Sequence, residues 1–503
     1  MKQTRRQLLT TLGATAAATT IPSFVNLSGW TWGDSQTLTT AALDADLGTF
    51  GSDADPSFLI HYEDDSQYRD LESWVNSNGD IKRDLEHVNL MVISASWEDI
   101  GLRERGYGAV SINQLSGGLQ ANDYVDYIDG NFEVDLPTPI DELDAEDEWS
   151  FDADISWPQR ASLMASTLEW SPSPSGIDGL AFDGDAPETD LTDSRELVRA
   201  DDDLIDEIDT GDLTIAVIDT GVDDGSTFGD RILEESTDFT SSDDPTGVDV
   251  VEDSDGHGTW VAVCMAGEDG FLPDADILAL KALDDGGGET GDIVAAVDKA
   301  IEEEVDVACL SLGSPLPSPA LAEALADAYD AGVLCVVAVG NDRYGSVFTN
   351  APASSTDGFG VQACNVPEDG DRADTQLAYF GNIGPDPQTG VNPELAAPGM
   401  AITADLPGGE STLSGTSMSA PHVAGGAGLV IASEETDVDE TWGRLTKTGY
   451  PLEHAGETEA EYGLLDVQAA IDNEEPDEDR EDVRSSEAQV RDEFNRLLSN
   501  VLG

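Results

Sequence analysis

The chain has 503 residues, of which 104 are Asp or Glu and 22 are Lys or Arg, so its formal net charge at pH 7 is −82. A polyanion of this strength excludes binding to DNA, RNA or an anionic lipid surface, because those affinities depend on Lys and Arg near phosphates. Such a charge with low hydrophobicity would indicate disorder, but 39% of the residues are hydrophobic, and the apolar runs at 213–218 and 333–339 predict buried strands. We therefore expect folded domains with acidic surfaces.

The charge and the choice of basic residue both favour a salt-loving host. Self-repulsion on this scale is tolerable where salt screens it, since the Debye length is about 3 Å at molar salt. Only five of the 22 basic residues are Lys, whose long apolar stem is poorly solvated in concentrated salt. The alternative is an acidic protein of ordinary cells.

Residues 1–24 have the layout of an export signal. Adjacent Arg5 and Arg6 precede a short apolar stretch diluted by threonines, and small residues follow at 16–18. The paired arginines resemble a twin-arginine signal, which directs folded proteins across a membrane. We expect secretion to the extracellular space by that route. No run of 18 or more apolar residues predicts a membrane-spanning helix.

The next segments predict a spacer and a small domain. Residues 25–55 are polar and rich in Gly and Asp, which is typical of a spacer. Residues 56–136 predict a compact α+β unit with a βαββαβ-like layout. Its expected elements are a strand at 58–62, a helix at 70–78, a strand at 88–95, a short helix at 112–119 and strands at 125–134.

Three further segments follow. Residues 137–194 are acidic and contain Ser-Pro-Ser-Pro, which indicates a linker or a loosely packed arm. Residues 195–472 alternate strand and helix patterns with Gly-rich turns, which predicts an α/β domain with a doubly wound, mostly parallel sheet and helices on both faces. Residues 473–503 form a charged tail that ends in an amphipathic helix, with these apolar residues on one side: Val490, Phe494, Leu497, Leu498 and Val501.

Two segments present a carboxylate and an imidazole. Asp219 ends the apolar strand of IAVIDTGVD, at the strand edge where open α/β sheets place their sites, although an Asp that caps a turn would show the same pattern. His257 stands between two glycines in DGHGT, ahead of an apolar helix, and is a candidate general base.

A third segment, LSGTSMSAPHVAG, presents a serine. Ser417 lies just ahead of a predicted helix, in the positive field of its N-terminus, although an ordinary N-cap serine is the alternative and Ser419 fits that role. We expect Pro421 to lie near the first turn, where its missing N–H costs little. His422 is interpreted as a packed structural residue inside the helix.

These three motifs together resemble the subtilisin family (subtilases), in particular secreted halophilic members of the halolysin type. The resemblance spans about 195–470 and identifies Asp219, His257 and Ser417 as the catalytic triad, in the chain order known for this family. It further implies that Asn341, at the end of VVAVGND, is the oxyanion donor. The segment Ser311, Leu312 and Gly313 would pair with the substrate as an added strand.

The resemblance implies a secreted serine endopeptidase that acts on proteins or peptides through an acyl-enzyme. It also implies that unit 56–136 is an inhibitory prodomain, so that the chain is a zymogen, and that the enzyme is a monomer. The alternative is a non-catalytic binding or surface module that kept the fold. The family usually has His at Trp260 and Gly at Val263, so we expect altered packing on that helix.

Metal and disulfide sites are not assigned. None of the four cysteines shows metal-site spacing, and all lie in apolar stretches. Cys309 and Cys335 fall on segments that we expect to be neighbouring strands, which leaves a disulfide open. No cofactor is assigned from the sequence. Acidic clusters leave calcium open as a ligand, but the loop at 267–273 is too short for the calcium site of the family's bacterial members.

Overall fold

The computed structural model describes residues 57–96, 128–131, 133–135, 188–223, 227–241, 243–284, 287–314, 317–341, 343, 348–477 and 480–502. The predicted signal at 1–24, the spacer at 25–55, the helix at 112–119 and most of the linker at 137–194 lie outside these residues. No helix of the described part is long and apolar enough to cross a membrane.

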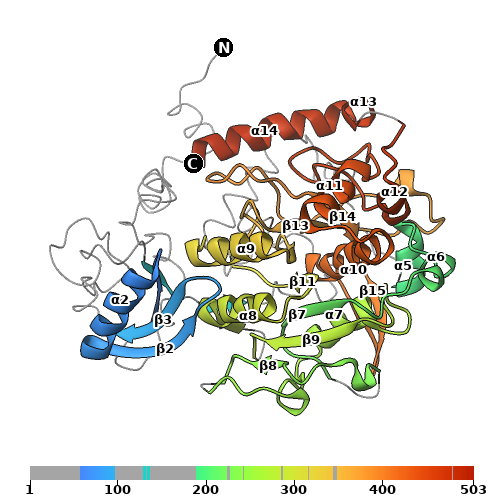
Figure 1. The fold of residues 1–503 in the computed structure, drawn as a ribbon. Coiled ribbons are helices and arrows are strands. Elements are labelled where there is room, and N and C mark those ends of the chain that lie inside the picture. The colour runs from blue at the N-terminus through green and yellow to red at the C-terminus, as the bar shows by residue number, and fades with distance from the viewer. Residues whose placement is uncertain are drawn as a thin grey trace, which may run out of the picture.

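A seven-stranded sheet forms the centre of the molecule, with the order β14-β13-β12-β11-β7-β9-β8 (Figure 1). Every neighbouring pair is parallel. The predicted doubly wound parallel sheet is therefore confirmed. The strands are β7 (Thr214–Asp219), β8 (Thr237–Asp238), β9 (Asp276–Lys281), β11 (Val307–Leu310), β12 (Leu334–Ala338), β13 (Phe359–Cys364) and β14 (Leu395–Pro398).

Helices cover both faces of this sheet. The alternate side chains of each strand point to opposite faces, so Val217 joins the core under α7 (His257–Ala266) and α10 (Thr416–Glu434). Its neighbour Ala216 joins a second core under α8 (Thr290–Glu302) and α9 (Pro319–Ala331). The strands are thus covered by apolar side chains on both faces, which explains the continuous apolar runs of the sequence.

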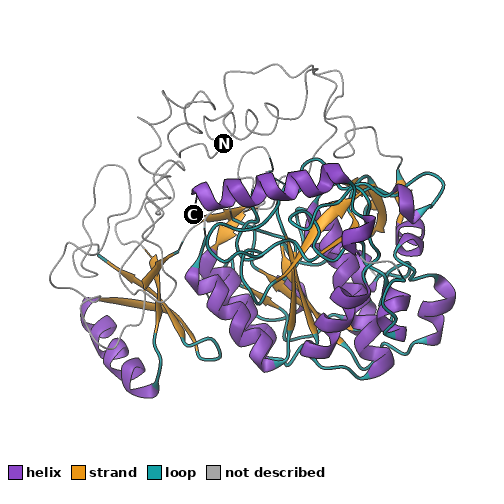
Figure 2. Cartoon of the chain, turned by 90° about the horizontal axis from the view of Figure 1, so that it is seen from above, coloured by secondary structure: helices purple, strands orange, loops and turns teal. Residues whose placement is uncertain are grey.

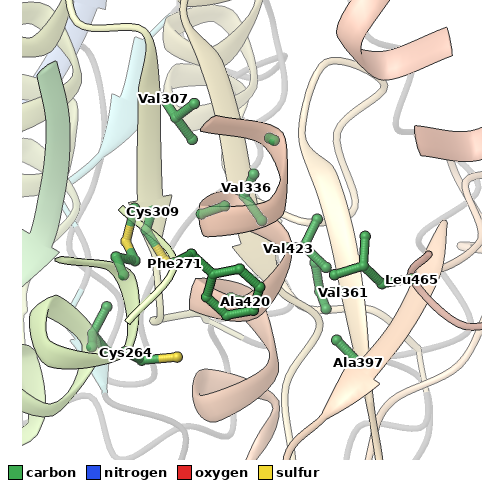
Figure 3. Close-up of a cluster of buried hydrophobic side chains, with 14 of the residues drawn as sticks. Cys264, Phe271, Val307, Cys309, Val336, Val361, Ala397, Ala420, Val423 and Leu465 are labelled. Carbon is green, nitrogen blue, oxygen red and sulfur yellow. The ribbon is translucent and has the colours of Figure 1, made fainter. Parts of the chain in front are cut away.

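The four cysteines are buried and free. Cys309 pairs in register with Val336, whereas Cys335 pairs with Ala308. This one-residue offset places the two cysteines on opposite faces of the sheet, and only Cys309 lies in the cluster of Figure 3. The disulfide left open by the sequence is therefore absent, although the two strands are neighbours as expected.

The catalytic domain begins before the predicted boundary at 195, because Thr189 pairs with Ile402.

The remaining elements surround the sheet. These elements are β6 (Thr189–Asp190), α5 (Leu191–Leu197), α6 (Asp202–Glu207), η7 (Gly229–Arg231), η8 (Val248–Val250), β10 (Gly287–Glu289), η9 (Arg372–Asp374), β15 (Ile402–Leu406), β16 (Gly409–Leu413), α11 (Val438–Thr448), α12 (Val467–Asp472), α13 (Arg480–Val483) and α14 (Ser486–Leu502).

The N-terminal unit is the expected α+β sandwich. In the described part of this unit, helix α2 covers an antiparallel sheet with the order β2-β3-β1-β4. Its elements are β1 (Ser57–His61), α2 (Asp65–Asn78), β2 (Gly79–Leu85), β3 (Leu90–Ala95) and β4 (Ile128–Gly130), and a short β5 (Glu133–Asp135) follows. The helix starts earlier than predicted because Asp64 caps it, accepting hydrogen bonds from Ser66 N and Gln67 N.

Strand β2 was not predicted from the sequence. Its less exposed residues are Ile81, Arg83 and Leu85, so an arginine interrupts the apolar alternation that would indicate a strand. The side chain of Arg83 is not solvated but bonds to Asp244 and Asp292 of the large domain. The polar pattern of β2 therefore reflects a contact between the two units.

The N-terminal sheet packs against α8 and α9, beside which it lies in Figures 1 and 2. Leu59, Val88 and Val92 on one face share a single core with these helices. The other face, including Phe58 and Ile93, packs with α2. The two units are thus joined by apolar burial as well as by ion pairs.

The predicted C-terminal amphipathic helix is confirmed as α14, but its polar side faces the protein. Arg491, Asp492 and Asn495 are buried. Val490 and Leu497 are 43% and 49% exposed. Ion pairs and hydrogen bonds, not the apolar stripe, therefore hold α14 on the domain.

Candidate active site

The candidate site lies at the carboxyl edge of three neighbouring strands. Asp219 ends β7, Ser311 follows β11, and Asn341 lies three residues beyond β12. Because β12, β11 and β7 are adjacent and parallel, these three positions share one edge of the sheet. The N-termini of α7 and α10 bring His257 and Ser417 to the same region.

Asp219 and His257 form a buried hydrogen-bonded pair. His257 Nδ1 lies 2.8 Å from Asp219 Oδ1, and both side chains are almost completely buried. Thr220 N also donates to Asp219 Oδ1, at 2.8 Å. A Cβ on Gly258 would stand 2.2 Å from Gly221 O and 3.0 Å from Asp219 Cβ, so this position must be glycine. The glycine after the histidine therefore permits the close approach of α7 to β7.

The pKa of His257 lies above its ordinary value. Burial opposes the charged imidazolium, but the negative charge of Asp219, its hydrogen bond, and then the charges of Asp255 and Asp253 outweigh burial. Asp219 is thus placed to stabilise a proton on the imidazole.

Ser417 is the second residue of α10 and is buried. Its Oγ donates to Ser311 O at 3.1 Å, and Ser311 Oγ donates to Ser417 O at 2.9 Å. Pro421 explains the second bond, because it has no N–H to donate to the carbonyl four residues earlier, which is Ser417 O. Pro421 lies beyond the first turn, so the reason expected for the low cost of its missing N–H was wrong: Ser311 Oγ supplies the replacement donor to Ser417 O.

Asn341 is oriented by the start of α10. Its Oδ1 accepts from Thr416 N and from Thr416 Oγ1, both at 2.9 Å. These two bonds fix the amide with its oxygen toward the helix and its NH2 group turned away. A Cβ on Gly415 would lie 3.0 Å from Asn341 Nδ2, so the glycine leaves space beside that group.

Comparison with known proteins agrees with this geometry. The model of the subtilase family matches residues 210–463, which is half of the chain. The chain belongs to the subtilase family. The match includes all three motifs and the strand edge on which they meet.

Curated relatives support the same assignment. This subtilase is 32% identical to the major intracellular serine protease of Bacillus subtilis (strain 168) over 278 residues, which is 51% of this chain and 82% of the relative. It is 34% identical to Subtilisin Savinase of Lederbergia lenta over 224 residues, 43% of this chain and 75% of the relative. It is therefore a serine-type peptidase.

A solved structure shows the same fold. Fervidolysin from Fervidobacterium pennivorans, a keratinolytic enzyme related to subtilisin, aligns with a TM-score of 0.56 at 18% identity. The alignment covers 84% of this chain and 62% of that one.

The predicted substrate-binding segment of the subtilase lies beside the serine but is covered. Ser311, Leu312 and Gly313 are all buried, and Leu312 belongs to the core under α8 and α9. Ser314 pairs with Ala351 by two backbone hydrogen bonds of 2.8 Å, which closes one side of the segment.

The site lacks one contact of a working triad. His257 Nε2 is buried without a hydrogen-bond partner among the described residues, and the Ser417 hydroxyl is directed to Ser311 O. Catalytic hydrogen bonds are often long or misaligned without substrate. A rotation of the Ser417 side chain would be needed to engage His257.

The chain departs from the usual family sequence at Trp260 and Val263, and both side chains pack in the hydrophobic core. The Trp260 indole is completely buried, and its Nε1 donates to Ser411 O of β16 at 3.1 Å. Val263 is buried in the same core. The expected change in packing thus occurs between α7 and the β15–β16 hairpin, without loss of the Asp219–His257 contact.

His422 is a structural residue, as the sequence analysis expected. Its Nδ1 lies 2.8 Å from Met418 O and its Nε2 lies 2.8 Å from Ser194 Oγ. Burial is the main cause that lowers its pKa to about 4, so the ring stays neutral. Ser419 is not the N-cap, which is Gly415.

Sequence reasoning missed three residues that hold the site: Thr220, Asp253 and Thr416. Thr220 directly follows Asp219, Thr416 directly precedes Ser417, and Asp253 lies four residues before His257.

The described residues contain no group of three or more His, Cys, Asp or Glu side chains suited to a metal ion.

Proposed function

We propose that this subtilase is a serine endopeptidase that uses Ser417 as nucleophile, His257 as general base and Asp219 as the residue that orients the imidazole. The observation that carries the proposal is the buried 2.8 Å contact between His257 Nδ1 and Asp219 Oδ1. It leaves Nε2 as the ring nitrogen that can take a proton from Ser417.

The reaction follows from these positions. The Ser417 hydroxyl gives its proton to His257 Nε2 while Oγ attacks the peptide carbonyl. The oxyanion of the tetrahedral intermediate accepts hydrogen bonds from the Asn341 amide and from a backbone N–H at the start of α10. His257 then protonates the leaving amine. Water, deprotonated by the same imidazole, releases the acyl group and restores Ser417.

We further propose that the N-terminal unit inhibits the enzyme before it is removed. Arg83 anchors it, because the guanidinium makes two 2.8 Å bonds to Asp244 and one 2.7 Å bond to Asp292. Burial raises the pKa of Asp292 to about 6 in spite of Arg83. Among the described residues, the ion pairs of Asp244 and Asp292 are made with this arginine of the N-terminal unit.

The last described strands of this unit cap two helices of the catalytic domain. Asn131 Oδ1 accepts from Gly291 N at 2.7 Å, at the start of α8. Asp129 Oδ2 accepts from Ser318 Oγ at 2.7 Å, at the start of α9. Strand β5 then pairs antiparallel with β10. Strand β5 is thus added to β10 of the catalytic domain by backbone pairing, which is the way an extended substrate would bind.

The remaining proposals concern the setting of the enzyme. We propose that it is secreted by the twin-arginine route as a monomeric zymogen, on the layout of residues 1–24. The charge of −82 supports activity in concentrated salt. Folding before export would place an inhibited enzyme, not an active one, in the cell.

Replacement of Ser417 tests the function. The wild-type protein, freed of its N-terminal unit, should hydrolyse casein in molar salt, and Ser417→Ala should reduce the rate by several orders of magnitude. Ser419→Ala, two residues further along the same helix, is the matched control and should keep most of the activity. If the wild type were inert after removal of the unit, the chain would be a binding module with the subtilase fold.

A further inference from the structure

One carboxylate outside the triad ties together the two segments that carry Asp219 and His257. Asp253 lies in the loop between η8 and α7, and its side chain accepts five hydrogen bonds. Its Oδ1 accepts from Thr220 Oγ1 at 2.9 Å and from the backbone of Asp255 and Gly256. Its Oδ2 accepts from Thr259 N at 2.8 Å and from Thr259 Oγ1 at 2.7 Å.

The bond to Thr220 connects Asp253 to the aspartate of the triad. Thr220 directly follows Asp219, and its backbone N–H donates to Asp219 Oδ1, the same oxygen that His257 Nδ1 contacts. Thr220 Oγ1 also accepts from Gly258 N at 2.9 Å. One threonine therefore contacts Asp219, Asp253 and the residue after His257.

The bonds to Thr259 connect Asp253 to the helix that carries the histidine. The first N–H groups of a helix have no partner within the helix. The N-cap of α7 is Gly256, which has no side chain to bond them. Asp253 and Thr220 replace that cap, since they accept from Thr259 N and Gly258 N respectively. His257 thus opens α7 directly before two residues whose backbone N–H groups are bonded by Thr220, next to β7, and by Asp253.

We propose that Asp253 is a positioning residue of the active site, which fixes the turn after Asp219 and the first turn of α7 relative to each other. The proposal rests on the proposed function of the triad. Charge-assisted hydrogen bonds are the stronger kind, and the loss of five from one carboxylate would free both segments. A displacement of about 1 Å in a catalytic group can lower the rate roughly 100-fold.

Asp255 provides a matched control for the charge of Asp253. Both carboxylates contribute to raising the pKa of His257, and Asp255 contributes more. Asp255 is exposed, and its side chain makes no hydrogen bond within the described residues. Asp255→Asn therefore removes a similar charge without removing any contact between the segments.

The test compares Asp253→Ala, Asp253→Asn and Asp255→Asn in molar salt, by the pH dependence of kcat and KM for a peptide substrate. We expect Asp253→Ala to lower kcat about 100-fold with KM nearly unchanged. Asp253→Asn keeps one oxygen acceptor and the side-chain shape, so we expect a smaller loss in a folded protein. Asp255→Asn should keep the plateau value of kcat and move the acidic limb to lower pH.

A proton NMR measurement makes the test independent of activity. The His257 Nδ1 proton, hydrogen-bonded to Asp219, should give a strongly downfield signal that Asp253→Ala and Asp253→Asn weaken or shift and Asp255→Asn retains. A wild-type kcat and an unchanged signal in both Asp253 variants would overturn the positioning role, as would equal effects of Asp253→Asn and Asp255→Asn. An inert wild type whose downfield signal still depends on Asp253 would refute the proposed function while supporting the positioning role.

Discussion

Replacement of Arg491 by alanine should loosen the attachment of the C-terminal helix to the catalytic domain. Arg491 lies on α14, and its guanidinium bonds to both carboxylate oxygens of Glu459 at distances of 2.8–3.1 Å. Both side chains are buried, and Arg343 Nη2 contacts the same carboxylate at 2.6 Å. Glu459 therefore depends on two arginines, one of which belongs to the helix.

The pKa of Glu459 indicates the size of the effect. Burial alone would raise it, but Arg491 and then Arg343 outweigh burial and lower it from 4.5 to about 2. A shift of this size corresponds to about 3 kcal/mol. Arg343 remains in Arg491→Ala, yet the carboxylate loses its larger partner while buried. Breaking a buried pair from one side typically costs about 3–5 kcal/mol, so we expect a loss of roughly 3 kcal/mol in the free energy of unfolding.

Arg496 on the same helix provides the matched control. It pairs with Glu457 at 2.7 Å, but the two side chains are 43% and 38% exposed, so Arg496→Ala should cost less than about 1 kcal/mol. Urea unfolding at fixed molar salt, followed by tryptophan fluorescence, measures both variants without changing the ionic strength. Equal midpoints for Arg491→Ala and Arg496→Ala would refute the reasoning.

The same pair predicts a pH dependence. The pKa of Glu459 is lower in the folded than in the unfolded state, so its stabilisation is complete above about pH 4.5 and disappears as the pH falls toward 2. Glu459→Gln should remove this part of the acid dependence of stability. An acid denaturation curve of Glu459→Gln with the wild-type slope in that range would contradict the assignment.

Four further outcomes are expected. Asn341→Ala should lower kcat about 10²–10³-fold with little change in KM, the magnitude known for the oxyanion donor of this family, and steady-state kinetics will show whether it does. Trp260→Ala should cost about 3–5 kcal/mol in urea unfolding, because it leaves a cavity and an unpaired Ser411 carbonyl. The acidic limb of kcat/KM should lie above the ordinary histidine pKa, since His257 must be neutral to act as base and its pKa is raised. Removal of salt should lower both the melting temperature and the activity, and full activity in dilute buffer would exclude salt adaptation.

The sequence was informative where local pattern and chemistry agree. Continuous apolar runs predicted the parallel strands, and each motif residue predicted to be catalytic lies at or beside the carboxyl edge of the sheet. The glycine after His257 illustrates why, since the backbone approach at Gly258 excludes any side chain. Such constraints are visible in sequence because a single residue type satisfies them.

The sequence did not predict side-chain contacts between residues that lie far apart in the chain. Arg83 interrupts the apolar alternation of β2 because its partners lie more than 150 residues away. The inward polar side of α14 has the same origin, since Arg491 bonds to Glu459. The bond from Ser311 Oγ to Ser417 O depends on a carbonyl that Pro421 frees, and its two residues are more than 100 positions apart in the chain. No local pattern reports such pairings.

The central claim, that the buried pair of Asp219 and His257 activates Ser417, is tested most directly by a serine-directed fluorophosphonate. The enzyme freed of its N-terminal unit is treated with the reagent in molar salt, and the adduct is located by mass spectrometry of its peptides. We predict a single adduct on Ser417 in the wild type and a rate of labelling that falls by several orders of magnitude in His257→Ala. Labelling of a different serine, or labelling of Ser417 that proceeds equally fast in His257→Ala, would contradict the account.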